Sequence, residues 1–234
     1  MPRRVLFLSM AAVCLTTVGC GGSGDGGSAT ASSTPTSRHL VADGLARLPA
    51  ETPEDLVTYG DAVVVTRVVS DEDIRPSEAE DDLPEDDQVV GRRLQVEVEE
   101  TVWQRGGADD PPRSFEYEGL GWVGSGDERI PMVSESGVRE EVGDRYLMVI
   151  VLYPEGWAPL ASSTTRPVKQ GQVVWNDEGA QEPTQDETAL STLFDGRSPR
   201  EIGRSLAATE PDPAADFSLD PEARFQDAMA NAGG

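Results

Sequence analysis

The residues from Arg145 to Tyr153 limit the possible folds of this chain more than any other segment. Seven consecutive residues within it, 146–152, are apolar or aromatic. A short, continuous apolar run bounded by polar residues is typical of a strand that is covered on both faces, whereas a half-exposed strand alternates apolar and polar residues. We therefore predict a central β-strand here, with other elements packed on each side of it.

Shorter β-type segments precede and follow this run. Leu94 to Glu99 alternates apolar and polar residues, which predicts a half-buried strand. The alternation slips at Glu99-Glu100 before Val102 and Trp103 resume it, and an extra residue in a β-bulge would explain the slip. Further short strands are expected at 62–69, 115–118, 157–161 and 172–175.

Helix signals lie on both sides of this β-rich region. Thr52 followed by Pro53 is typical of a capping residue and the first helical position, and Gly60 would end that helix. Ser198-Pro199-Arg200-Glu201 forms a capping box that predicts a second helix. Two more helices are expected at 188–194 and from Asp220 onward.

The N-terminus has the pattern of an export signal. Pro2-Arg3-Arg4 precedes an apolar stretch from Val5 to Val18. That stretch is shorter than the roughly 20 apolar residues that span a bilayer, but it has the length of a signal-peptide core. Cys20 then stands between this core and the Gly/Ser-rich residues 21–28.

The segment Thr17-Val18-Gly19-Cys20 resembles a bacterial lipobox. The resemblance implies cleavage between Gly19 and Cys20, and it implies a diacylglyceryl group and a further fatty acid such as palmitate on Cys20. Thr17 departs mildly from the leucine that is usual at the first lipobox position. An ordinary secretory signal with a coincidental cysteine, or a short uncleaved anchor, is the alternative interpretation.

Cysteine content and charge exclude several classes of protein. The second cysteine, Cys14, lies inside the apolar core that cleavage removes, so the processed chain would have no disulfide and no Cys-ligated metal. The 43 acidic residues outnumber the 19 basic ones and give a net charge of -24, which argues against binding to nucleic acid. Lys169 is the single lysine, and this bias toward arginine points to a GC-rich, actinobacterial type of genome.

These patterns predict a mainly β chain with flanking helices. We expect a signal peptide at 1–19 and, at 20–51, the lipidated Cys20 with a flexible, disordered Gly/Ser/Thr stalk. A small, closed or partly closed β-barrel with C-terminal helices would occupy 52–208, and a linker with a short terminal helix would occupy 209–234.

The string Gly143-Asp144-Arg145-Tyr146-Leu147, after the strands at 62–69 and 94–103, resembles the strand order of bacterial OB-like modules, some of which are similar to the netrin-type barrel. The resemblance spans about residues 61–175 and implies a fold only. Protease inhibition does not carry over, because the inhibitors of that family need a free N-terminal cysteine and disulfides.

Candidate sites are few. The acidic run from Asp71 to Asp87 is interpreted as a solvated hairpin loop, and calcium binding there stays open because the spacing matches no EF-hand. Trp122 and Trp157, beside glycines in expected loops, are the candidates for stacking against a ligand. His39 is the only histidine and lies at the edge of the stalk, so no catalytic residue and no metal or other cofactor is predicted.

The sequence therefore favours a non-catalytic lipoprotein at the extracytoplasmic face of the cell membrane. It would be anchored through Cys20 and would bind or scaffold an envelope protein or a cell-wall ligand, without binding nucleic acid. A solute-binding or cell-wall-modifying accessory lipoprotein, which could be an enzyme, is the alternative.

Overall fold

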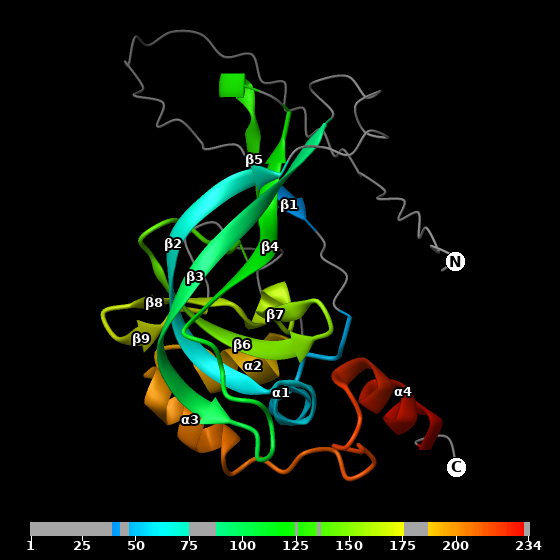
Figure 1. Cartoon of the computed structure of the whole chain (residues 1–234). Helices are drawn as coiled ribbons and strands as arrows, with labels where there is room; N and C mark the ends of the chain where they lie inside the picture. Colours follow the sequence, from blue (N-terminus) through cyan, green and yellow to red (C-terminus); the bar gives the residue numbers. More distant parts are fainter. Residues whose placement is uncertain are drawn as a thin grey trace, which may run out of the picture. The chain divides into compact units, whose positions relative to one another are not determined.

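A computed structural model describes residues 39–42, 47–74, 88–124, 126–134, 137–175 and 187–231, all within one compact unit that spans residues 37–234. The fold is mainly β: a mixed nine-stranded sheet curls into a half-barrel, and the C-terminal part is helical (Figure 1). The predicted mainly β fold with C-terminal helices is confirmed at this level.

The sheet runs in the order β1-β5-β4-β3-β2-β6-β8-β9, with β7 paired to β6. Its strands are β1 (Leu40–Ala42), β2 (Ala62–Ile74), β3 (Val89–Gln104), β4 (Ser114–Val123), β5 (Ile130–Ser134), β6 (Arg145–Tyr153), β7 (Gly156–Pro159), β8 (Arg166–Lys169) and β9 (Gln172–Val173). The described helices are α1 (Pro53–Tyr59), α2 (Glu187–Phe194), α3 (Pro199–Leu206) and α4 (Pro221–Asn231). Only the β1–β5 pair is assigned as parallel among the described strand pairs.

Strand β6 has both faces buried, as the apolar run predicts. Leu147, Val149 and Val151 point into one apolar cluster together with residues of α1, α2 and α3. Met148 and Ile150 point into a second cluster, which includes residues of β3 and β4. Because successive side chains of a strand point to opposite faces, a nine-residue strand contributes to both cores at once.

The predicted bulge in β3 is confirmed. Val65 of β2 pairs with Glu100 and the next residue, Thr66, pairs with Val98, so Glu99 is the extra residue on β3. The side chain of Glu99 accepts hydrogen bonds from Arg67 at 2.8 Å and from Arg145 at 2.6 Å. The bulge therefore places one carboxylate between two arginines on neighbouring strands, and it contributes to the bend of the sheet.

The helices begin where the capping signals predict. Thr52 accepts a hydrogen bond from the Asp55 backbone N–H, which begins α1, and a capping box at Ser198 begins α3. The last helix, α4, is held against α1 because the guanidinium of Arg224 donates a hydrogen bond of 2.7 Å to the Thr58 carbonyl. Phe225 packs edge-on against Tyr59, whereas Met229 is 60% exposed.

Three strands were not predicted from the sequence, namely β1, β5 and β8. Each is three to five residues long, too short to show a clear alternation of apolar and polar residues. β1 and the buried side chains of Leu48 and Ala50 lie N-terminal to Thr52, where we expected the folded part to begin.

The structure also corrects the boundary of the acidic hairpin loop. Strand β2 continues through Asp71, Glu72 and Asp73, which we expected in the loop. Glu72 lies opposite Arg93 in the β2–β3 ladder, and Asp73 lies opposite Arg92. Opposite charges across a strand pair stabilise it, so these acids favour the strand here. The rest of the run, residues 75–87, falls outside the described residues.

The contact between α3 and β3 makes a testable prediction at Gly203. Replacing glycine by alanine inside a helix usually stabilises a protein by about 0.5–1 kcal/mol. A Cβ atom at Gly203, however, would lie 2.1 Å from the Val102 carbonyl oxygen. We expect Gly203→Ala to lower the free energy of unfolding by about 1–3 kcal/mol, because α3 must move away from β3.

Urea unfolding of the variant and of Arg204→Ala measures this effect. Arg204 is exposed on the same helix, so its replacement should change the free energy of unfolding by less than about 0.5 kcal/mol. A stabilised Gly203→Ala protein would show that α3 does not pack this closely on β3.

Candidate functional site

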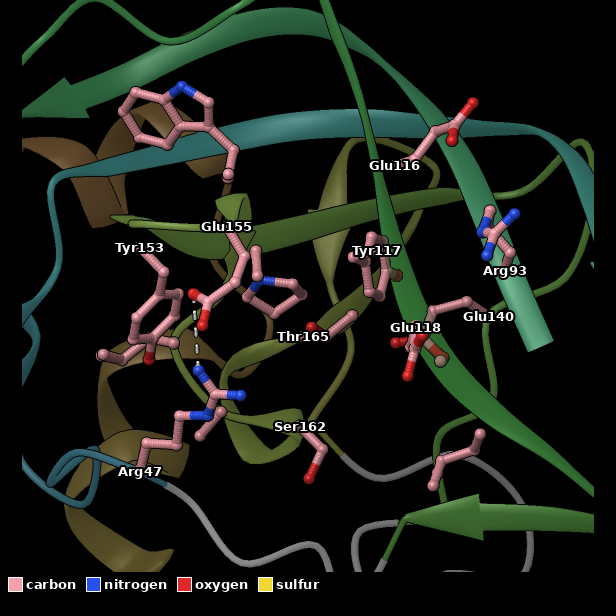
Figure 2. Close-up of a pocket in the computed structure, with 18 residues that line it drawn as sticks. Arg47, Arg93, Glu116, Tyr117, Glu118, Glu140, Tyr153, Glu155, Ser162 and Thr165 are labelled. Atoms are coloured by element: carbon pink, nitrogen blue, oxygen red, sulfur yellow. Dashed lines mark ion pairs between the residues drawn. The ribbon is translucent and has the colours of Figure 1, made fainter. Parts of the chain in front are cut away.

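A cavity of about 790 Å³ lies beside β4 and β7 (Figure 2). It forms where the curled sheet brings β4 against β7, although β7 takes its ladder hydrogen bonds from β6. Its volume lies within the range of about 300–1,000 Å³ that is usual for small-molecule sites. Most of the lining comes from β4, from the β6–β7 hairpin and from the connection to β8, and Arg47, Arg93 of β3 and Glu140 of the β5–β6 connection complete it. The wall includes Tyr117, Glu140, Tyr153, Leu160, Ala161, Ser162 and Thr165.

The alternation of β4 decides which of its side chains face the cavity. Tyr117 is buried, while its neighbours Glu116 and Glu118 are exposed. Figure 2 shows Tyr117 directed toward the connection that carries Thr165 and Glu116 directed the other way. The two glutamates therefore border the cavity from the outer face of the strand, and an aromatic hydroxyl faces inward.

The inner wall carries three buried polar groups. Tyr117 is 9% exposed, Glu140 is 6% exposed and Thr165 is fully buried. The hydroxyl oxygens of Tyr117 and Thr165 have no hydrogen-bond partner of normal geometry among the described residues. Burial, and next the negative charge of Glu140, raise the pKa of the Tyr117 phenol well above its usual value, so this hydroxyl stays protonated.

Glu140 is surrounded by groups that partly offset its burial. Desolvation raises the pKa of its carboxyl, and the nearby guanidiniums of Arg92 and Arg139 and the Tyr117 phenol oppose that rise. Tyr117 and Glu140 interact at close range, yet the phenol oxygen and the carboxylate do not reach normal hydrogen-bond geometry. The inner wall therefore combines one carboxyl group with two hydroxyls that can each donate and accept.

At the mouth of the cavity one guanidinium lies close to two carboxylates. Arg47 lies 3.8 Å from Glu155, and the same guanidinium lies 3.8 Å from Glu222. It also lies over the ring of Tyr153 at 5.2 Å, and burial raises the pKa of that phenol to about 12. The mouth therefore presents a guanidinium, two carboxylates and an aromatic ring.

Trp122, the first predicted stacking residue, lies in strand β4 rather than in a loop. The guanidiniums of Arg129 and Arg139 lie over its ring at 4.0 and 3.9 Å. Its indole N–H donates a hydrogen bond of 3.2 Å to Asp73. A ligand that stacked on Trp122 would have to displace one of these arginines.

Trp157, the second predicted stacking residue, also lies in a strand, β7, and it lines the cavity. It is half-buried and packs against the cluster that contains Met148 and Ile150. The other two tryptophans belong to the core on the helical side: Trp103 packs against it, and Trp175 stacks on Phe194. The cavity brings Trp157 into a candidate site and leaves Trp122 outside it.

Several predicted residues cannot be placed. Gly19 and Cys20 fall outside the described residues, as do residues 75–87 of the acidic run. Within the described ranges, no group of three or more histidine, cysteine, aspartate or glutamate side chains is arranged to hold a metal ion. None of the helices described here is long and apolar enough to cross a membrane.

Tyr117, Glu140 and Thr165 were not among the predicted site residues. Tyr117 occupies an ordinary apolar position of an alternating strand, and Thr165 follows a short 3-10 turn at Ser162–Thr164. Glu140 is one of 43 acidic residues. No local pattern distinguishes these three, because the curling of the sheet brings them together.

Comparison of the chain with models of protein families, with curated proteins and with solved structures finds no match.

The buried carboxyl of Glu140 generates a prediction about pH. Because its pKa is raised in the folded state, the folded protein retains a proton that the unfolded chain has lost. The contribution of Glu140 to stability is therefore largest below about pH 4.3, the pKa of an unperturbed glutamate, and falls as the pH rises toward the folded value. Glu140→Gln removes this titration.

Urea unfolding over a series of pH values measures the contribution of Glu140 to the free energy of unfolding. The free energy of unfolding of the wild type, minus that of Glu140→Gln, should decline as the pH rises from about 4 toward neutrality. A difference that is constant, or that rises with pH, would contradict the raised pKa.

Proposed function

We propose that this protein is a lipid-anchored, extracytoplasmic lipoprotein with a non-catalytic binding or scaffolding role at the cell envelope. The observation that carries the proposal is the sequence Thr17-Val18-Gly19-Cys20, which lies between an apolar core and a Gly/Ser-rich segment. Two or more acyl chains on one residue anchor a protein stably, whereas a single chain binds only marginally. Cys20 alone would therefore hold the protein at the membrane.

The charge of the chain supports attachment by lipid. A net charge of -24 opposes adhesion to an anionic membrane surface or wall polymer. A Gly/Ser-rich composition like that of residues 21–28 is typical of linkers, and a linker there would let the folded unit stand away from the bilayer. The same charge disfavours nucleic acid as a partner.

A binding role is supported by the cavity beside β4 and β7. It has the volume of a ligand site and a polar inner wall. A solute-binding or cell-wall-modifying accessory role remains the second candidate, because the same cavity would suit it. We also keep the OB-like likeness as a proposal about the finer fold, in which the half-barrel corresponds to part of such a barrel.

The lipid anchor is tested by metabolic labelling with a fatty acid in bacteria that express the full chain. Wild type is expected to take up label, and Cys20→Ala is expected to take up none. Cys14→Ala is the matched control, since this cysteine lies in the segment that cleavage removes. Equal labelling of wild type and Cys20→Ala would refute the anchor.

The binding role is tested by crosslinking on intact cells with the full-length lipoprotein, followed by purification and identification of attached proteins. A partner recovered at several salt concentrations, and absent from cells that lack the protein, is the expected result. Recovery of nothing above background at every salt concentration would argue against a protein partner.

A further inference from the structure

We propose that the cavity beside β4 and β7 binds a neutral saccharide, and that the hydroxyls of Tyr117 and Thr165 are its hydrogen-bond partners. This inference goes beyond the lipoprotein proposal and does not depend on the anchor. It rests on two buried hydroxyls that line one cavity without a hydrogen-bond partner of normal geometry, on the excess of carboxylates in the lining of that cavity and on its volume.

The two hydroxyls are the main observation. Tyr117 is 9% exposed, Thr165 is fully buried, and both line the cavity. Neither oxygen has a hydrogen-bond partner of normal geometry among the described residues, and both are shielded from bulk water. The Tyr117 hydroxyl lies close to the Glu140 carboxylate, whereas Thr165 has no such neighbour within the described part of the chain. Folded proteins seldom leave a buried polar group unpaired, because the lost hydrogen bond to water is not replaced. Phenylalanine and valine would fill the same space without this cost, so the hydroxyls point to a ligand.

The chemistry of the wall selects an uncharged ligand with hydroxyl groups. A tyrosine or threonine hydroxyl can both donate and accept, which matches the hydroxyls of a sugar. Arg47 and Glu155 at the mouth are paired with each other, and Glu116 and Glu118 project from the opposite face of β4. The second arginine of the lining, Arg93 on β3, lies opposite Glu118 in the β3–β4 ladder. Carboxylates outnumber guanidiniums among the lining side chains, so the cavity disfavours an anion.

The rest of the cavity wall and the volume of the cavity also agree with a neutral saccharide as the ligand. Pro159, Leu160 and Ala161 supply apolar surface, and Tyr153 supplies an aromatic ring at the mouth. A sugar has apolar C–H faces between its hydroxyl groups. The apolar part of the wall can pack against those faces, and the hydroxyls of the wall can form hydrogen bonds with the hydroxyls of the sugar. About 790 Å³ is enough for one or two sugar rings. Because the two oxygens are shielded, a small rotation of the lining side chains must accompany binding.

Binding is tested with the purified full-length lipoprotein in a detergent that has no sugar headgroup. The neutral probes are D-glucose, N-acetyl-D-glucosamine and trehalose, and the charged counterparts are D-glucuronate and D-glucosamine. Ligand-observed NMR and calorimetric titration should detect binding of at least one neutral sugar, with D-glucuronate at least about tenfold weaker. Failure of every neutral sugar to bind, or tighter binding of a charged one, would overturn the proposal.

Variants separate a ligand contact from a structural role. Tyr117→Phe and Thr165→Val remove one hydroxyl each and keep the shape of the side chain. Without a ligand, each should raise the melting temperature or leave it unchanged, because the cost of an unpaired group disappears. Each should also weaken sugar binding by at least about threefold, the loss of one hydrogen bond.

Tyr146→Phe is the matched control. The Tyr146 hydroxyl donates to the Arg139 carbonyl at 3.0 Å and accepts from the Glu141 N–H at 2.9 Å. Its loss should lower the melting temperature by about 2–4 °C and leave sugar affinity unchanged. If Tyr117→Phe or Thr165→Val destabilises the protein as Tyr146→Phe does, that hydroxyl already has a partner in the unliganded state and the proposal fails.

Discussion

The burial of strands β2 and β6 on both faces is the constraint on which the rest of the structure depends. Their side chains alternate between the cluster under α1, α2 and α3 and the cluster enclosed by the curled sheet. A sheet with both faces buried needs a layer on each side. Helices supply one layer, and the other comes from the sheet itself, since β3 and β4 curl over the second face. The sheet curls into a half-barrel because helices cover only one of its two faces.

Buried arginines hold the curled part of the sheet in place. Arg92 has no exposed surface and donates a hydrogen bond of 2.7 Å to Asp71. Arg139 donates to the carbonyls of Leu120, Gly121 and Met132 at 2.6–2.8 Å, and so joins the β5–β6 connection to β4 and β5. Burying a charge costs free energy, and several charge-assisted hydrogen bonds are needed to offset that cost. These contacts fix geometry rather than add much stability.

Local sequence predicted the elements whose signals are complete within a few residues. The apolar run of β6, the alternation of β3, the bulge at Glu99 and the caps at Thr52 and Ser198 are of this kind. The extension of β2 through Asp73 was missed because the stabilising arginines lie on β3, about twenty residues away in sequence. β1 has no local signal, since its only assigned ladder partner is β5.

The same difference between local signals and contacts that are distant in sequence explains which residues of the candidate site could be predicted. Trp122 was selected for its residue type and its neighbouring glycines, but residue type cannot show that Arg129 and Arg139 lie over the ring. Gly121 is there because a Cβ would lie 1.8 Å from the Val90 carbonyl oxygen, so it serves close strand packing rather than a loop. Tyr117 and Thr165 are 48 residues apart and become neighbours of one cavity only when the sheet curls.

The position of the cavity explains why the hydroxyls of Tyr117 and Thr165 lack a hydrogen-bond partner of normal geometry. Backbone groups in a sheet are satisfied by the ladder, and buried side-chain hydroxyls usually reach a nearby backbone carbonyl. Tyr146 does so at the Arg139 carbonyl, because the β5–β6 connection passes beside its hydroxyl. Tyr117 faces the gap between β4 and β7, where no ladder forms, and Thr165 follows the turn that borders the same gap. A sheet closed by hydrogen bonds at this point would have removed the cavity, so the incomplete closure that leaves a half-barrel also leaves this cavity open.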